Sequence, residues 1–322
     1  MTPIALAIHG GCGVMAKLGL SEEEWQAARA DLAASLRAGW AVLVKGGSAL
    51  DAVEAAVVVM EDSPHFNAGY GAALNENAEH ELDASMMDGS NLDAGGVCAA
   101  TRIRNPVKAA RAVMEKSSAV LLTGAAADCF AERNGLDIVA PDYFTTERRQ
   151  KALAAMKAHA KAGTFAAASE SEKHGTVGAV ALDGSGHLAA ATSTGGYNNK
   201  PVGRVGDSPI VGAGTYARDG VCAVSGTGQG EYFIRLVVGH EIASRVAYLG
   251  ETLEAAANRV IREDLKSYGI GAGAVAVDAK GNVTAPYNTD GMFRGWVTSD
   301  GRLHVASHGE VFFVETLEDG AQ

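Results

Sequence analysis

The sequence has few cysteines, and their spacing argues against two kinds of stabilising site. The chain of 322 residues contains four, namely Cys12, Cys98, Cys129 and Cys222, which are far apart and form no C-x-x-C motif or Cys/His pair. Structural zinc sites and disulfide frameworks both depend on such pairs, so neither is indicated. Reduced, mostly buried thiols are typical of cytoplasmic proteins, and we therefore expect a cytoplasmic protein.

Long apolar runs and basic clusters are missing as well. No stretch of 18 apolar residues could form a transmembrane helix. The opening MTPIALAIHGG lacks a charged n-region and is interrupted by Gly10 and Gly11, so we expect a first buried strand rather than a signal peptide. The formal net charge is −11 and no basic run stands out, which disfavours nucleic acid and membranes as partners.

What the chain does contain is typical of a globular protein with many tight backbone approaches. Hydrophobic residues make up 47% of the sequence, and the length permits a large core or two domains. The 40 glycines indicate close contacts and tight strand ends around a site.

Helical patterns dominate the first half, after a strand expected at 4–9. Ser21 and Glu24 predict a capping box before a helix to Val44, and Ser48 and Asp51 predict a second box before a helix ending near residue 61. Further helices are expected behind an Asn105 cap with Pro106 in the first position, at about 123–133, and at about 147–161. The segment 64–97, rich in glycine, asparagine and aspartate, predicts ordered hairpins near a site.

Short strands dominate the second half. We expect strands at 176–182, 187–193, 209–214, 221–225, 273–277, 282–285, 293–297, 303–306 and 311–315, and helices at about 231–248 and 252–267. The strand at 4–9 has no local partner, so we expect both halves to form one layered domain over residues 1–322.

One strand of the second half begins in an unusual way. A polar, alanine-rich run, KAGTFAAASESEK, ends at Lys173 and forms most of a linker expected at about 162–175. His174, Gly175 and Thr176 come next, and an apolar run follows. A cut between Gly175 and Thr176 would leave a hydroxyl and a free α-amine on adjacent atoms. An α-amine has a pKa of about 7.7–8.0, so near neutral pH it can accept the hydroxyl proton. Alone, this stretch fits an ordinary Gly-Thr at a strand start better, and the other motifs reverse that preference.

Four further stretches accompany the one around Thr176. They are FNAGYG at 66–71, STGGYNNKPVGRVGDSP at 193–209, SGTGQGE at 225–231 and PYNTDGMFRGW at 286–296. Each is a weak signal alone. Together with HGG at 9–11 and ELDASMMDG at 81–89, they resemble the plant-type L-asparaginase and isoaspartyl peptidase family of N-terminal-nucleophile hydrolases, over essentially the whole chain.

The resemblance implies a set of catalytic residues. Thr176 would be the nucleophile, freed by self-cleavage after Gly175, and Thr194 would support its hydroxyl. The hydroxyl of Thr227 and the backbone N–H of Gly228 would form the oxyanion hole, which suits a strand-to-helix position because free amides point out of a helix N-terminus. Cleavage would divide the chain into an α subunit, 1–175, and a β subunit, 176–322.

The resemblance also implies how a substrate and an ion are held. Arg204 would bind the α-carboxylate of an aspartyl unit and Asp207 its α-amine, because a guanidinium matches a carboxylate and a carboxylate matches an ammonium. Asn67 and Gly230 would line the site. The resemblance implies that no cofactor is required for the chemistry. It also implies a sodium ion bound by backbone carbonyls of the loop around 60–70, here those of Met60, Glu61, Ser63, Phe66, Ala68 and Tyr70.

The expected protein is thus an α+β, four-layer αββα sandwich with two central, mainly antiparallel sheets. It would hydrolyse the side-chain amide of L-asparagine and β-aspartyl dipeptides through an acyl-enzyme on Thr176, and it would be a homodimer of cleaved protomers. The partners are small molecules. His174 is expected to be a bystander, and Gln229, between the two glycines of TGxGE, leaves the leaving-group preference open.

Other interpretations of the same residues remain open. Arg204 and Asp207 also fit a surface ion pair, Asn67 a turn, Thr194 a plain strand position and His9 a core histidine. SGTGQGE resembles a dinucleotide loop, although Glu231 stands where the third glycine belongs. HGG resembles an esterase oxyanion loop, but the chain has no G-x-S-x-G. At the level of function, the alternatives are a glycosylasparaginase-like hydrolase, a binding protein that never cleaves, and a nucleotide-binding oxidoreductase.

Overall fold

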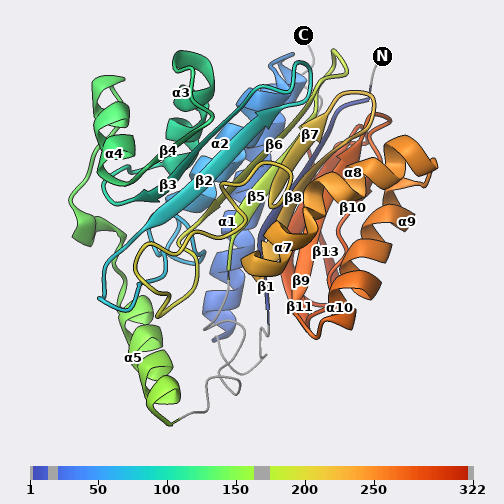
Figure 1. Cartoon of the computed structure of the whole chain (residues 1–322). Coiled ribbons are helices and arrows are strands. Elements are labelled where there is room, and N and C mark those ends of the chain that lie inside the picture. Colours follow the sequence, from blue (N-terminus) through green and yellow to red (C-terminus); the bar gives the residue numbers. More distant parts are fainter. Residues whose placement is uncertain (1–2, 14–20, 163–174, 318–322) are drawn as a thin grey trace.

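The fold is built on two β-sheets that lie face to face. The structure is a computed structural model and describes residues 3–13, 21–162 and 175–317. The larger sheet has nine strands in the order β13-β12-β11-β1-β5-β6-β2-β3-β4, and the smaller has four in the order β10-β9-β8-β7. Every neighbouring pair is antiparallel except β3 with β4, so the sheets are mainly antiparallel, as expected (Figure 1).

The strands of both sheets come from distant parts of the chain. Their bounds are β1 Ala5–Gly13, β2 Leu82–Asp88, β3 Ala94–Ala100, β4 Leu121–Thr123, β5 Val177–Leu182, β6 Leu188–Thr194, β7 Thr215–Arg218, β8 Cys222–Gly228, β9 Ala272–Asp278, β10 Val283–Thr284, β11 Gly291–Thr298, β12 Arg302–Ala306 and β13 Val311–Thr316. Strand β1 pairs with β5 on one side and β11 on the other, so its partners both lie in the second half of the chain.

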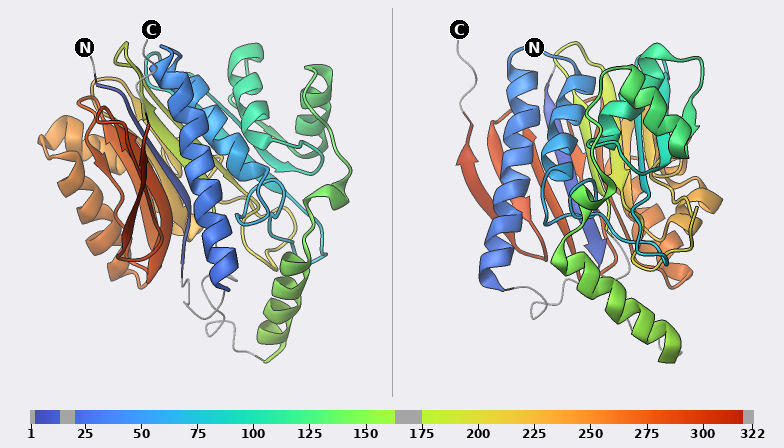
Figure 2. Two further views of the ribbon diagram at one scale, coloured as in Figure 1. Left: turned by 180° about the vertical axis from the view of Figure 1, so that it is seen from behind. Right: turned by 90° about the vertical axis from the view of Figure 1, so that its left-hand side faces the viewer.

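Helices cover the outer faces of the two sheets. Their bounds are α1 Glu22–Val44, α2 Ala49–Glu61, α3 Pro106–Lys116, α4 Gly124–Arg133, α5 Glu147–Ala162, α7 Gly230–Leu236, α8 Val238–Leu249, α9 Leu253–Asn258 and α10 Leu265–Ser267. Helices α1 and α2 pack on the larger sheet, and α8 and α9 pack on the smaller one. Figure 2 shows the strands between these two groups of helices. In the described ranges no helix has the length and apolar character needed to cross a membrane.

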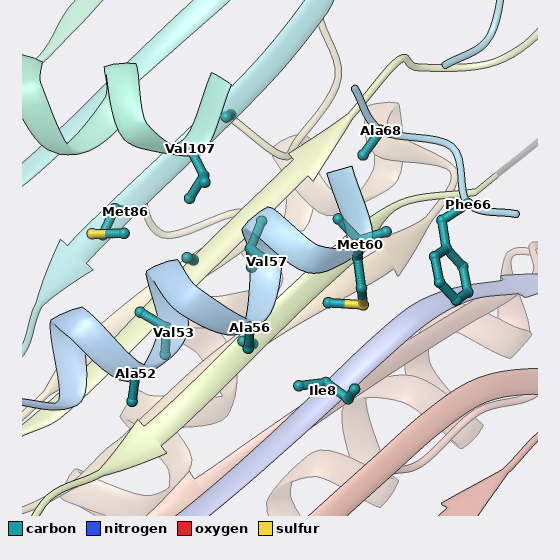
Figure 3. Packing of buried hydrophobic residues seen from close by; sticks show 14 of the residues in the cluster. Ile8, Ala52, Val53, Ala56, Val57, Met60, Phe66, Ala68, Met86 and Val107 are labelled. Atoms are coloured by element: carbon teal, nitrogen blue, oxygen red, sulfur yellow. The ribbon is translucent and has the colours of Figure 1, made fainter. Parts of the chain in front are cut away.

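Alternation along the central strands sends apolar side chains into two separate cores. On β1, Leu6 and Ile8 join the core beneath α1 and α2, whereas Ala5 and Ala7 join the core between the sheets. Successive side chains of a strand point to opposite faces, so the central strands of the larger sheet are buried on both sides. Ala56 and Met60 of α2 point towards the strands in the first of these cores (Figure 3).

Most expected elements are present, with local differences. The Ser21–Glu24 capping box is present in full, and Ser48 accepts a hydrogen bond from the Asp51 amide. Asn105 stands at the N-cap of α3, but its side chain makes no capping bond and donates instead to Asp62. None of the cysteines, all of which are described, forms a disulfide bond.

The strand expected at 209–214 was a wrong prediction. These residues form turns, because the carbonyl of Asp207 accepts hydrogen bonds from the amides of Ile210 and Gly214, and Gly212 has φ +89°. The strand begins afterwards, at Thr215. An apolar Pro-Ile-Val run favoured a strand, but the polar group at residue 207 determines the local backbone.

Two long helices expected in the second half are interrupted. Val237 adopts a left-handed conformation with φ +50° and separates α7 from α8. The first amides of α8 donate to the carbonyls of Gly212 and Ala213, so tertiary contacts satisfy the new helix end. The helix after Thr252 changes to π geometry over Arg259–Asp264, for which the sequence pattern carries no signal.

Candidate active site

Thr176 lies where the sequence predicted, immediately before the central strand of the larger sheet. It precedes β5, which stands between β1 and β6, and only 6% of its surface is exposed. Thr194 is the last residue of β6. Because Val177 pairs with Ser193 in the antiparallel register, the next pair along brings Thr176 to Thr194. The two hydroxyl oxygens are 3.2 Å apart.

Three side-chain donors converge on the carbonyl oxygen of Gly175. It lies 2.8 Å from Thr176 Oγ1, 2.9 Å from Thr194 Oγ1 and 2.8 Å from Asn67 Nδ2. Each hydroxyl has one proton, so Thr176 can donate either to this carbonyl or to Thr194 at any moment. The arrangement places a nucleophilic oxygen beside a peptide carbonyl that is already polarised by two other donors.

Asn67 is fixed in this cluster by bonds at both ends of its amide. Its Nδ2 also donates to the carbonyl of Gly196 at 2.6 Å, and its Oδ1 accepts from the amide of Ala73 at 2.6 Å. The side chain is buried. Asn67 is therefore more than a turn residue, because its amide connects the loop at 66–71 to the Gly175 carbonyl.

A small pocket lies on one side of this cluster. Its walls include Thr176, Thr194, Arg204, Asp207 and Gly228. Asp207 is 4% exposed, and its Oδ2 has no hydrogen-bond partner among the described residues. Burial raises the pKa of Asp207 from 3.8 to about 7, although the positive charge of Arg204 opposes this shift. Asp207 lines the pocket, and a carboxylate in a pocket wall is an acceptor for a cationic ligand.

Arg204 approaches the same pocket from the loop that follows β6. Its Nε and Nη2 both lie 3.0 Å from Glu231 Oε1, and its guanidinium stacks 4.7 Å above the ring of Tyr197. The side chain is 12% exposed, so the alternative of a surface ion pair with Asp207 is wrong. Close packing explains why residue 230 is a glycine, since a Cβ there would lie 2.8 Å from Asp207 Oδ1 and 3.0 Å from Arg204 Nη2.

Thr227 and Gly228 occupy the end of β8, across the space between the sheets. Gly228 lines the pocket, whereas Thr227 is completely buried and is not part of the pocket wall. The Thr227 hydroxyl oxygen accepts from the amide of Cys12 at 3.3 Å. Its proton stays available for donation. The structure thus brings Gly228 directly to the site and leaves Thr227 behind it.

Comparisons with known proteins identify the family of this chain. A family profile described as asparaginase matches residues 1–307. The chain belongs to the asparaginase family. The isoaspartyl peptidase of Escherichia coli is 46% identical over 299 residues, which cover 92% of this chain and 93% of that protein. The human isoaspartyl peptidase/L-asparaginase is 42% identical over 309 residues, covering 94% and 96%, and a probable enzyme of the same name from Arabidopsis thaliana is 39% identical over 323, covering 94% and 98%.

This asparaginase-family chain has polar site neighbours that sequence reasoning did not assign. Glu231 is the last residue of the TGxGE motif, and its side chain accepts a hydrogen bond from Arg204. The motif therefore also positions Arg204. This contact also argues against a dinucleotide loop, because the position of the third glycine holds a carboxylate that pairs with Arg204. The motif itself was the available signal, since a charged residue in a glycine-rich run invites the search for a partner.

A buried chain of hydroxyl groups crosses between the sheets next to the site. His9 Nε2 lies 2.9 Å from Ser225 Oγ, which lies 2.7 Å from Thr192 Oγ1, and Thr215 and Ser85 continue the chain. Burial lowers the pKa of His9 to about 3, so the ring is neutral. His9 is therefore a core histidine, as expected. The hydroxyl chain was missed because serine and threonine on strands carry no distinctive spacing.

The loop nominated for sodium curls back onto the end of α2. The carbonyl of Glu61 accepts from the amide of Tyr70 at 2.7 Å, and a Cβ on Gly69 would lie 2.3 Å from that carbonyl oxygen. The Glu61 side chain points elsewhere, bonding Ser193 Oγ at 2.7 Å, and burial raises its pKa to about 8. In the described ranges no three His, Cys, Asp or Glu side chains gather to hold a metal.

The buried carboxyl of Asp207 predicts a specific effect of pH on stability. Its pKa is about 7 in the folded state against 3.8 for the ordinary group, so between these values only the folded protein keeps the proton. Stability from this group is complete at low pH and is lost as the pH rises towards 7. Moving from pH 5 to 7 should stabilise Asp207→Asn relative to the unaltered protein by about 2 kcal/mol.

Urea denaturation at the two pH values measures this difference. Glu61 and other buried acids also make the free energy of unfolding depend on pH, but their contributions are the same in both proteins and cancel in the difference. An identical pH dependence of the two proteins would mean that Asp207 is ionised in its pocket throughout this range.

Proposed function

We propose that the protein is an amidohydrolase that activates itself by cutting its chain between Gly175 and Thr176, and that it then hydrolyses L-asparagine and β-aspartyl dipeptides. The observation that carries the proposal is the convergence of Thr176, Thr194 and Asn67 on one peptide carbonyl. The relatives' names, isoaspartyl peptidase and L-asparaginase, give the substrate class.

Self-cleavage follows from the arrangement around Gly175. Thr176 Oγ1 attacks the Gly175 carbonyl carbon, and the oxyanion stays bonded to Asn67 Nδ2 and Thr194 Oγ1. The C–N bond breaks, and the hydroxyl proton passes to the nitrogen, which leaves an ester between Gly175 and the Thr176 oxygen. Water hydrolyses this ester and releases a carboxylate on Gly175 and a free amine on Thr176.

The freed Thr176 then acts on substrate. Its α-amine, with a pKa of about 7.7–8.0, accepts the hydroxyl proton as the oxygen attacks the side-chain carbonyl of the aspartyl unit. Arg204 holds the substrate α-carboxylate, and Asp207 holds the α-ammonium. Thr227 and Gly228 donate to the oxyanion, ammonia or an amino acid leaves, and water hydrolyses the β-aspartyl ester.

The electrostatics of the pocket support this orientation of the substrate. Asp207 is buried with an unsatisfied oxygen, so an ammonium group would restore the interaction that burial removed. Charge-assisted hydrogen bonds of this kind contribute about 1.5–3 kcal/mol each. Glycines at 206 and 230 leave space for both charged side chains to approach.

The same proposal covers the architecture. The stacking of helices on two facing sheets supports a four-layer αββα sandwich of the N-terminal-nucleophile type, in one domain over residues 1–322. Pairing of β1 with β5 and β11 would hold the 1–175 and 176–322 subunits together after cleavage. The linker at about 162–175, with His174, lies almost wholly outside the described residues. We propose a cytoplasmic homodimer of cleaved protomers, whose mass sedimentation velocity would measure.

The loop at 60–71 is proposed to hold a structural sodium ion through the carbonyls of Met60, Glu61, Ser63, Phe66, Ala68 and Tyr70. All six donors are main-chain oxygens, which suit a hard cation, and two of them, those of Met60 and Glu61, lie at the C-terminal end of α2, where carbonyl oxygens carry partial negative charge. We expect replacement of sodium by choline to lower the melting temperature. Equal melting temperatures in the two salts would exclude a stabilising ion at this loop.

The first test of the function is intact mass spectrometry after incubation. The unaltered protein should separate into fragments of 175 and 147 residues, whereas Thr176→Ala should remain a single chain of 322, because the nucleophile is gone. Thr298→Ala, whose hydroxyl donates to Asp300, is the matched control and should cleave normally. Cleavage in Thr176→Ala, or a different new N-terminus, excludes the mechanism, and a protein that never cleaves but binds aspartate is the non-catalytic alternative.

A second test concerns the oxyanion. Thr227→Ala, assayed on protein that has already cleaved, should lower kcat by about 10²–10³, which corresponds to roughly 2.7–4 kcal/mol for one lost donor. The assay is release of ammonia from L-asparagine. An unchanged kcat would mean that Thr227 has only a structural role, through its contact with Cys12, and that Gly228 stabilises the oxyanion without it.

A further inference from the structure

A second pocket lies on the other side of the Gly175–Thr176 bond. We call it the Arg149 pocket; its walls include Gly11, Phe66, Asn67, Arg148, Arg149 and Phe293. Gly175 lines both this pocket and the one that contains Arg204 and Asp207, and no other described residue lines both. The scissile glycine therefore separates two pockets whose walls have different chemistry.

Two adjacent arginines give the Arg149 pocket its positive charge. Arg149 is 5% exposed, and its Nε donates to the carbonyl of Gly71. Arg148 Nη1 lies 3.4 Å from the carbonyl of His65. Neither guanidinium forms an ion pair with a carboxylate in the described ranges.

In the part of the chain that the structure describes, the charged groups nearby do not neutralise these arginines. Glu24 interacts with Arg148 at longer range, and its carboxylate is engaged at the capping box of α1. Asp31 is paired with His65 at 2.8 Å. Burial lowers the pKa of Arg149 to about 9, so its side chain is still charged at neutral pH. A buried charge without a counterion is costly, and an anionic ligand would offset that cost.

Two aromatic rings, Phe66 and Phe293, form an apolar part of the wall of the Arg149 pocket. Phe66 and Phe293 meet edge to face with ring centroids 5.8 Å apart, and Trp25 packs against Phe293 at 5.3 Å. Cationic groups beside an aromatic wall suit a ligand that has both a carboxylate and a side chain. A free amino acid has this combination.

The two pockets meet at the reacting bond. A Cβ on Gly11 would lie 3.1 Å from Gly175 Cα and 3.2 Å from the Thr176 nitrogen, so the bare backbone of Gly11 borders the place where the new amine forms. Once the Gly175–Thr176 bond is cut, the Thr176 hydroxyl and amine would lie between Asp207 and Arg204 on one side and Arg149 on the other. A β-aspartyl dipeptide extends in both directions from its scissile amide.

From this geometry we propose that the Arg149 pocket is the leaving-group subsite, in which Arg148 and Arg149 bind the α-carboxylate of the amino acid released from a β-aspartyl dipeptide. The inference rests on the proposed function. The same carboxylate chemistry has a second source, the new C-terminus of Gly175 after cleavage. L-Asparagine has no second carboxylate, so the subsite would favour dipeptides over asparagine.

The first arm of the test changes only the substrate. Cleaved, unaltered protein is assayed with β-aspartyl-leucine, with β-aspartyl-leucinamide, whose leaving-group carboxylate is blocked, and with L-asparagine. We expect the amide to lose about 10- to 100-fold in kcat/KM relative to the free acid, the range of one or two lost charge-assisted hydrogen bonds. Equal kcat/KM values for the acid and the amide would overturn the leaving-group subsite, and the Gly175 carboxylate would then be the ligand of the pocket.

The second arm changes the arginines. In Arg148→Gln and Arg149→Gln the preference for the free acid over the amide should shrink towards one, and Arg149→Lys should keep part of it because the charge stays but the fork is lost. Arg259→Gln, in the exposed π-helical turn, is the matched control and should keep the full preference. Taking the ratio within each variant cancels any general damage from losing the Arg149 bond to Gly71.

The outcomes separate the subsite from the function it rests on. Retention of the full preference in both glutamine variants overturns the subsite while hydrolysis itself stands. Cleaved protein that hydrolyses neither asparagine nor any dipeptide overturns both. If the glutamine variants fail to fold, the substrate arm decides the question, because it uses the unaltered protein.

Discussion

The structure is organised around one carbonyl group, that of Gly175, and the three donors that surround it. These donors belong to separate segments: the loop at 66–71, the end of β6 and the residue that precedes β5. Their meeting depends on β5 standing in the middle of a nine-stranded sheet, between β1 and β6. Because both faces of that sheet are buried, Thr176 has no freedom to slide out of register.

Many of the polar side chains buried near the sheet centre bond to one another, which lowers the cost of burying them. His9, Ser225, Thr192 and Thr215 form a continuous hydrogen-bonded chain between the two sheets. A side chain at Gly178 would fill this space, since its Cβ would lie 1.9 Å from Ser225 Oγ. Two exceptions are informative. Among the described residues Asp207 Oδ2 has no hydrogen-bond partner and Arg149 has no ion pair, and both residues line pockets.

These two exceptions lie on opposite sides of the bond that we propose is cut. In this proposal the buried acid and Arg204 on one side match the two charged α-groups of an aspartyl unit, and Arg148 and Arg149 on the other side match a carboxylate. The site thus has a polarity along the direction of a dipeptide. In the uncut chain, Gly175 occupies the point where the two halves meet, so activation and access to both halves are coupled in this proposal.

The sequence by itself determined the local features that depend on neighbouring residues: the capping box at Ser21, the apolar run after Thr176, and the glycine-rich motifs that carry the family resemblance. The turns at 209–214, the break at Val237, the Arg204–Glu231 pair and the charge of the Arg149 pocket were decided only in the tertiary structure. The physical reason is common to them, since each depends on groups far apart in the chain. Carbonyls at 212–213 accept hydrogen bonds from the first amides of α8, at a point where local propensity alone would have continued α7. The arginines on α5 line a pocket only because β1 and the loop at 66–71 form the rest of its wall.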